Sequence, residues 1–109
     1  QGYMVAKMNL DGTDLVILTD SQGDCGAPCW TPDHKIIFQR DVRGISQLFS
    51  MDAKGESVKQ LTEQKIPCRY PSVSPDGKMI VFNLSDDSQS ELASIDLDGK
   101  NFTRWKGTK

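Results

Sequence analysis

The fold is decided by residues 30–38, which read WTPDHKIIF, and by residues 73–82, which read VSPDGKMIVF. In each stretch a Pro-Asp pair is followed by a lysine and a run of β-branched and aromatic residues. Proline fixes φ, and aspartate accepts hydrogen bonds from backbone N–H groups two residues on, so each pair predicts a tight turn before a strand. The predicted structural turn residues are Pro32, Asp33, Pro75, Asp76 and Gly77.

The two stretches belong to an internal repeat with a period of 43 or 44 residues. Turn and core residues recur at this spacing, as in the pairs Gly12 and Gly55, Leu18 and Leu61, Pro28 and Pro71, and Phe38 and Phe82. Periods of about 20 to 50 residues are typical of solenoids, propellers and arrays.

Short alternating segments separated by turn residues fill each repeat, and no window has a sustained 3.6-residue apolar stripe. The expected strands are 27–30, 35–40, 47–52 and 58–61, then 72–74, 78–84, 91–96 and 102–105, preceded by 3–9 and 15–19. Four strands in about 40 to 45 residues correspond to one blade of a β-propeller. Apolar Ile37, Phe38, Ile80 and Phe82 are expected to pack between successive blades.

The predicted fold class is therefore all-β, a β-propeller fragment of about two and a half four-stranded antiparallel blades. Residues 1–19 form a partial blade, and residues 20–62 and 63–109 form complete blades in this interpretation. Closed propellers use about four to eight blades. We therefore expect further blades, either from a longer chain or from self-association.

The repeats resemble the Trp-Ser-Pro-Asp-Gly-Lys signature of the TolB-like propeller family, whose units are WD40-like Pro-Asp repeats. Residues 8–13 (MNLDGT) before Leu18-Thr19, and 51–55 (MDAKG) before Leu61-Thr62, resemble the second half of that signature. The sequence departs from it at three places, which are His34 for the turn glycine, Val73 for the tryptophan and Trp105-Lys106 for the Leu-Thr pair. These departures predict an atypical last blade.

The resemblance implies a non-catalytic protein-interaction or scaffold module in the periplasm or cell envelope. In the Tol-Pal envelope system, TolB binds a peptidoglycan-associated lipoprotein, so a protein partner is expected. An alternative is the gating propeller of a larger enzyme, such as a prolyl-oligopeptidase-type or tricorn-type peptidase or an oligogalacturonate lyase. A third possibility is a bacterial surface protein that binds glycans or proteins.

No residue is predicted to be catalytic or to bind a metal or cofactor. His34 is the only histidine, it falls in a turn, and the chain has no Gly-x-Ser-x-Gly elbow. Residues 96–99 (DLDG) resemble the start of a calcium loop, but the further acidic ligands of an EF-hand do not follow. This segment therefore predicts a hairpin turn.

Cys25 and Cys68 are 43 residues apart and are expected at equivalent positions of adjacent blades, just before the inner strand. Two interpretations stay open for the cysteines. Either Cys25, Cys29 and Cys68 are all unpaired, or Cys25 and Cys68 form a disulfide.

Two loops are candidates for binding. The first holds Arg40, Asp41 and Arg43, and the second holds Asp86, Asp87 and Glu91. Each is expected to join the second and third strands of a blade, and such loops commonly carry binding specificity. The alternative interpretation, which the sequence favours, is a solvated hairpin tip.

The overall charge argues against a nucleic-acid partner. The 109 residues include 13 Lys and Arg against 15 Asp and Glu, a net charge of −2, which lacks the basic excess that phosphate backbones select. No apolar run reaches the roughly 18 residues of a membrane span, so no membrane insertion is expected, and no signal peptide is visible in the sequence.

Overall fold

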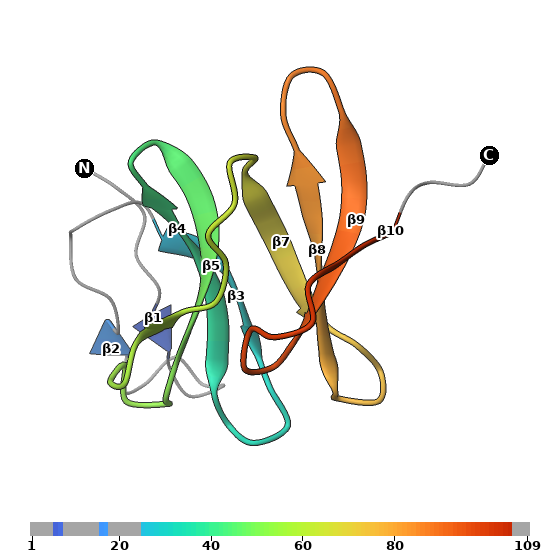
Figure 1. Cartoon of the computed structure of the whole chain (residues 1–109). Helices are drawn as coiled ribbons and strands as arrows, with labels where there is room; N and C mark the ends of the chain where they lie inside the picture. Colours follow the sequence, from blue (N-terminus) through green and yellow to red (C-terminus); the bar gives the residue numbers. More distant parts are fainter. Residues whose placement is uncertain (1–5, 8–15, 18–24, 106–109) are drawn as a thin grey trace.

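The computed structural model describes residues 6–7, 16–17 and 25–105, which form three successive antiparallel sheets (Figure 1). The first is a two-stranded sheet of β1 (Ala6–Lys7) and β2 (Val16–Ile17). The described part of the chain contains no helix, and accordingly none that could cross a membrane. The predicted all-β fold class is confirmed.

The first four-stranded sheet contains β3 (Cys25–Trp30), β4 (Ile36–Val42), β5 (Ile45–Met51) and β6 (Lys59–Gln60). Its strands lie in chain order, each paired antiparallel with the next. We call it the first blade sheet.

The second blade sheet has the same topology and contains β7 (Cys68–Val73), β8 (Met79–Ser85), β9 (Ser90–Asp96) and β10 (Thr103–Trp105). Both sheets have the strand number and order of a propeller blade. The division of the whole chain at residues 19/20 and 62/63 stays a prediction, because most of residues 1–24 lies outside the described residues.

The strands β3 and β7 each contain a β-bulge, where the register with the neighbouring strand shifts. In both, the residue before a proline has a left-handed backbone, with φ of 48° at Ala27 and 56° at Tyr70. These strands begin at Cys25 and Cys68, earlier than the predicted 27 and 72. A bulge lets each strand continue through its proline.

The core lies mainly between the two blade sheets, which stand side by side in Figure 1. Alternation along a strand sends successive side chains to opposite faces. The shared buried cluster comprises Ile37, Leu48, Leu61, Cys68, Ile80, Phe82, Leu84, Ala93 and Ile95. The predicted positions of Ile37, Ile80 and Phe82 between blades therefore agree with the structure.

A second cluster covers the face of the first blade sheet that is turned away from the second sheet. It contains Ile36, Phe38, Phe49 and Met51, and the rings of Phe38 and Phe49 stack with centroids 5.7 Å apart. Consecutive residues Ile36 and Ile37 thus bury opposite faces of one strand. Both faces of the first blade sheet are apolar and buried.

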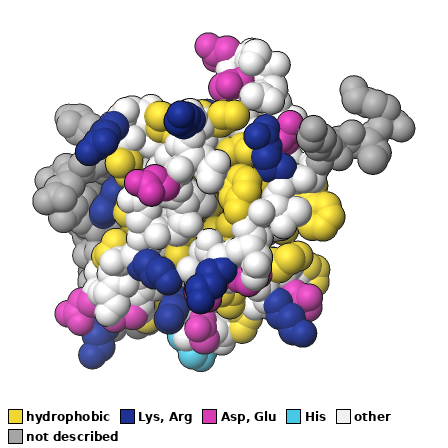
Figure 2. Space-filling view, in the orientation of Figure 1, with side chains coloured by type: hydrophobic (Ala, Val, Ile, Leu, Met, Phe, Trp, Pro, Cys, Tyr) yellow, Lys and Arg dark blue, Asp and Glu magenta, His cyan; other side chains and the backbone are white. Residues whose placement is uncertain are grey.

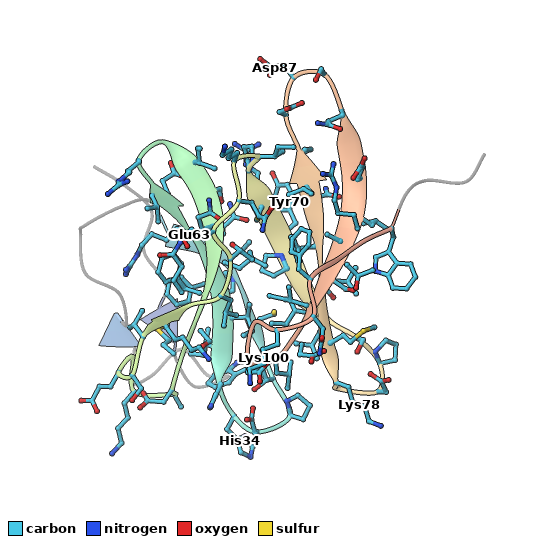
Figure 3. All side chains as sticks on the ribbon, in the orientation of Figure 1. His34, Glu63, Tyr70, Lys78, Asp87 and Lys100 are labelled. Atoms are coloured by element: carbon cyan, nitrogen blue, oxygen red, sulfur yellow. The ribbon has the colours of Figure 1, made fainter. Side chains whose placement is uncertain are left out.

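The turns fall at two ends of the molecule. The β4–β5 and β8–β9 turns lie at one end, which we call the hairpin end and which is at the top of Figure 1. The β3–β4 and β7–β8 turns lie at the opposite end, which we call the turn end. Figure 3 shows Asp87 at the hairpin end and His34 and Lys78 at the turn end.

Candidate functional site

The carboxylates of the Pro-Asp turns are occupied within the turns. Thr31 Oγ1 donates a hydrogen bond to Asp33 Oδ1, and Ser74 Oγ donates to Asp76 Oδ1 at 2.6 Å. The backbone N–H of Lys78 also donates to Asp76 Oδ1, at 3.0 Å. The Thr31 hydroxyl lowers the pKa of Asp33, and the Ser74 hydroxyl, followed by the Lys78 N–H, lowers the pKa of Asp76.

The two Pro-Asp turns also pack against each other. Gly77 has φ of 74°, and a Cβ added there would lie 2.7 Å from Cγ of Pro32 in the neighbouring turn. His34 adopts the matching left-handed conformation, with φ of 67°. At the same end, Lys59 Nζ donates to the Asp98 carbonyl at 3.0 Å. At the turn end, the Gly77–Pro32 packing and the Lys59–Asp98 hydrogen bond therefore join the two blade sheets.

The hairpin end begins with the β4–β5 turn, a two-residue loop in which Arg43 and Gly44 both have positive φ, 55° and 84°. This backbone matches a type I′ hairpin turn. The Arg40 guanidinium lies over the Phe38 and Phe49 rings, 5.6 and 5.1 Å from their centroids. Arg40 is therefore held against the sheet by cation–π contacts.

The β8–β9 loop is longer and is organised by Asp86. Its Oδ1 accepts hydrogen bonds from the N–H groups of Ser88 and Gln89, at 2.9 and 3.0 Å, and from the Ser88 hydroxyl at 3.0 Å. The Ser88 N–H and then its hydroxyl lower the pKa of Asp86. Glu91 accepts from Arg104 Nε at 2.7 Å.

The six candidate loop residues therefore fall into two groups. Arg40, Asp86 and Glu91 stabilise the fold, whereas Asp41, Arg43 and Asp87 are exposed, and no hydrogen bond or ion pair engages their side chains in the described part of the chain. Figure 2 shows acidic atoms projecting at the top of the view, where Figure 3 places Asp87.

A groove of about 300 Å³ lies beside the first hairpin. Val42, Arg43 and Ile45 line one side of it, and Glu63 and Gln64 from the link between the sheets line the other. A smaller groove of about 190 Å³ lies at the turn end, where Asp33, Lys35, Lys59 and Asp98 contribute to its walls.

A buried amide that the sequence analysis missed anchors the link between the sheets. Gln47 Oε1 accepts from Thr62 Oγ1 at 2.7 Å and from the Gln64 N–H at 3.1 Å, and its Nε2 donates to the Gln64 carbonyl at 2.7 Å. Thr62 Oγ1 in turn accepts from the Leu48 N–H at 2.9 Å. The recurring Leu-Thr pair was a signal for Thr62, but no local pattern marked Gln47.

Cys68 is buried and carries a free thiol, which donates to Gln47 Oε1 at 3.8 Å and to the Ile66 carbonyl at 3.6 Å. Cys29 is also free and half-buried. Burial raises the pKa of both thiols. The side chain of Cys25 lies outside the described residues, but because Cys68 is a free thiol, the structure does not contain the Cys25–Cys68 disulfide that was one of the two interpretations.

Among residues 6–7, 16–17 and 25–105, no three His, Cys, Asp or Glu side chains gather closely enough to hold a metal ion.

Comparison with known protein sequences gives one partial match that can be described. No protein-family model matches the chain. An uncharacterized protein of Agrobacterium fabrum is 26% identical over 110 residues, which cover 93% of this chain and 38% of that protein.

Solved structures support the same fold. A protein assigned as TolB from Agrobacterium tumefaciens superposes with a TM-score of 0.85 at 24% identity, over 93% of this chain and 40% of that one. TolB from Acinetobacter baumannii gives 0.72 at 26% identity, over 87% and 24%. The tricorn protease gives 0.66 at 17% identity, over 94% and 10%.

The sequence-based resemblance to TolB-like propellers is thus confirmed, and the two blade sheets have the architecture of a propeller fragment. The chain spans about two-fifths of the length of the first relatives that it matches.

Proposed function

We propose that this chain is a non-catalytic protein-interaction module within a TolB-like propeller, and that it meets a protein partner with its hairpin end. A single observation carries this proposal. At the hairpin end Asp41, Arg43 and Asp87 are exposed, and their side chains form no hydrogen bond or ion pair with the described residues, whereas the carboxylates of the Pro-Asp turns at the opposite end accept hydrogen bonds within their own turns.

The exposed charges of the hairpin end suit recognition of a partner protein whose surface carries both positive and negative groups. Arg43 lies at the tip of the first hairpin and Asp87 at the tip of the second. Exposed charges of this kind contribute mainly to the rate and specificity of association. The groove beside Arg43 adds apolar wall from Val42 and Ile45, where a partner side chain could be desolvated.

We place the protein in the cell envelope, most simply in the periplasm, in line with the TolB resemblance. The alternative, a gating propeller of a larger enzyme, draws on the tricorn protease, whose likeness at 17% identity concerns the fold alone. No observation in the described residues favours it over the interaction module.

Site-specific photo-crosslinking in the source cells tests the proposal. A photoreactive residue replaces Arg43 or Asp87 at the hairpin end, and Lys54 or Lys78 serves as the matched exposed control away from it. We expect adducts with a second protein from positions 43 and 87 and none from the controls. Charge reversal by Asp87→Lys should weaken the adduct at position 43.

Two results would contradict this assignment. Adducts that form only from positions 54 and 78 would move the interaction surface to the other end. Adducts that join the hairpin end to a catalytic domain of the same polypeptide would support the gating propeller instead.

A further inference from the structure

The groove of about 190 Å³ at the turn end lies between the two blade sheets, and we call it the inter-sheet groove. Ile37, Ser50 and Lys59 form one wall, and they are direct neighbours in a row across β4, β5 and β6. Leu97 and Asp98, from the turn after β9, form the opposite wall. Two repeats therefore build the groove together.

Short contacts hold the wall from the second sheet in place. Lys59 Nζ donates to the Asp98 carbonyl at 3.0 Å. A Cβ added at Gly99, whose φ is 90°, would lie 3.0 Å from the carbonyl oxygen of Leu61 in the first sheet. Within the turn, the Lys100 N–H donates to Asp98 Oδ1 at 3.1 Å. The groove is thus preformed, and a ligand would not have to order its walls.

Ser50 brings an unpartnered hydroxyl to this groove, although the residue is only 8% exposed. Its Oγ takes part in no hydrogen bond within residues 6–7, 16–17 and 25–105, yet it keeps some accessible surface, since no fully occluded side-chain N or O atom there lacks a partner. In the second sheet the equivalent hydroxyl is occupied, because Ser94 Oγ accepts from Trp105 Nε1 at 2.8 Å. Buried hydroxyls normally have a partner, so the one at Ser50 is available to a ligand.

The rim of the groove carries two ammonium and two carboxylate groups, which belong to Lys35, Lys59, Asp33 and Asp98. All four side chains are exposed, and no ion pair engages them in the described part of the chain. Each carboxylate uses Oδ1 within its own turn, which leaves Oδ2 without a hydrogen bond to a described residue. Figure 2 shows basic and acidic side chains interspersed over the lower part of the view, which is the turn end.

This balance of charge disfavours simple ions as ligands. The two carboxylates would repel an anion such as phosphate, and the two ammonium groups would repel a metal cation. A hydroxyl group both donates and accepts, so a ligand with several hydroxyls can donate to the carboxylates and accept from the ammonium groups at once. Hydrogen bonds to charged groups of this kind are the stronger ones. Ile37 and Leu97 add apolar wall for the C–H groups of such a ligand.

We propose that the inter-sheet groove binds one neutral sugar unit, with Ser50 contacting a sugar hydroxyl and the four charged groups surrounding the ring. The groove is smaller than the roughly 300–1,000 Å³ of sites for drug-sized ligands, which limits the occupant to a single ring. The groove lies at the turn end, so this proposal concerns a different surface from the hairpin end and does not depend on the function proposed above.

Amide chemical shifts of the intact chain test the proposal during titration with small probes. Glucose, galactose, mannose and N-acetylglucosamine are the neutral sugars, glycine is the zwitterion and inorganic phosphate is the anion. Ser50→Ala removes the unpartnered hydroxyl, and Lys35→Met removes one charge of the rim. Lys78→Met is the matched control, because Lys78 is exposed and holds the position of Lys35 in the other Pro-Asp turn.

We expect at least one of the four sugars to shift the amides around positions 31–37, 50, 59 and 97–98, with a Kd on the order of 1 mM. Ser50→Ala and Lys35→Met should each weaken binding about three- to tenfold, whereas Lys78→Met should leave the Kd unchanged. Ser50→Ala should unfold at the same temperature or a higher one, because its hydroxyl has no partner in the described part of the fold. A loss of binding in this variant is therefore not a loss of folding.

Three results would overturn the proposal. Shifts with glycine or phosphate but with none of the sugars would make the groove a site for a zwitterion or an anion. Sugar-induced shifts confined to the hairpin end, or a Kd that neither Ser50→Ala nor Lys35→Met alters, would place the sugar elsewhere. The absence of shifts with every probe would mean that the groove holds water alone.

Discussion

The two blade sheets are built from one repeat, yet equivalent leucines have opposite environments. Leu48 is fully buried and Leu92 is 53% exposed, although each lies on the third strand of its sheet. The difference arises from the neighbour, because the first sheet has the second beside it. Burial in a repeat protein is thus set by the adjacent unit as much as by the residue itself.

The outer corners of the two sheets differ as well. In the first sheet a buried amide and hydroxyl, Gln47 and Thr62, fasten the link to the next sheet. In the second, the Glu91–Arg104 ion pair occupies the corner, with Arg104 41% exposed. A buried network with all of its groups satisfied is costly to break, whereas an exposed ion pair contributes little.

The largest contrast is expected for truncation of the two leucines. Leu48→Ala removes a fully buried side chain from the shared cluster and should lower the free energy of unfolding by about 2–5 kcal/mol. Leu92→Ala should cost less than about 1 kcal/mol in the same chain, because its side chain is half in water. Urea unfolding of both variants measures the contrast, and equal losses would mean that the second face is covered in solution.

The next contrast concerns the corners. Gln47→Ala leaves the Thr62 hydroxyl and the Gln64 N–H without their acceptor and should cost about 1–3 kcal/mol. Glu91→Ala removes an ion pair with an exposed partner and should cost no more than about 1 kcal/mol. In 1 M salt the Debye length falls to about 3 Å, so screening should reduce the Glu91 effect further. The Gln47 effect should persist, because it rests on buried hydrogen bonds between uncharged groups. A Gln47 effect that disappears in salt would contradict the network.

A smaller effect separates two glycines that both have positive φ. Gly44→Ala meets nothing within 4 Å, so only backbone strain of about 1 kcal/mol is expected. Gly77→Ala carries similar strain and also places its Cβ against Pro32 Cγ, so it should cost more than Gly44→Ala in thermal unfolding. Equal costs would show that the Pro32 ring moves aside freely.

The smallest contrast is expected between the two Pro-Asp turns, because each blade sheet has one and the two are built alike. Hydroxyl donors lower the folded-state pKa of Asp33 and Asp76 below their ordinary value. Stabilisation by these carboxylates is therefore complete above the unfolded pKa and is lost as the pH falls through the folded pKa, at roughly pH 4 and below. Asp33→Asn and Asp76→Asn should each flatten the acid limb of the stability profile to a similar, small extent. A change confined to one variant would show that the turns are not equivalent.

The turns and central strands were predictable from the sequence because their determinants are local. Residues 35–40 and 78–84 were expected as strands, and β4 and β8 span Ile36–Val42 and Met79–Ser85. The Pro-Asp pairs lie where a hairpin needs them, and their hydroxyl partners stand two residues earlier in the chain. Periodicity and turn residues are sufficient for such elements.

The candidate site was predictable only in outline. Sequence position identified both hairpins, but it could not show that Arg40 stacks on two rings, that Asp86 closes its own loop, or that Glu91 pairs with Arg104. These contacts join residues from different strands or depend on loop conformation. The role of Gln47 was likewise hidden, since its partner Gln64 lies 17 residues away.

The bulges in β3 and β7 have a consequence for assembly. Each of these strands pairs on one side only, and its free side is interrupted by Pro28 or Pro71 and by the left-handed residue before it. A proline offers no N–H to an approaching strand, and a bulge twists the edge out of register. The β3 and β7 edges are thus protected from templating the addition of extended chains, which limits aggregation through these edges. A ligand that binds along β3 and β7 would therefore contact side chains, such as the exposed Tyr70 and Trp30, and would not add a strand by main-chain hydrogen bonds.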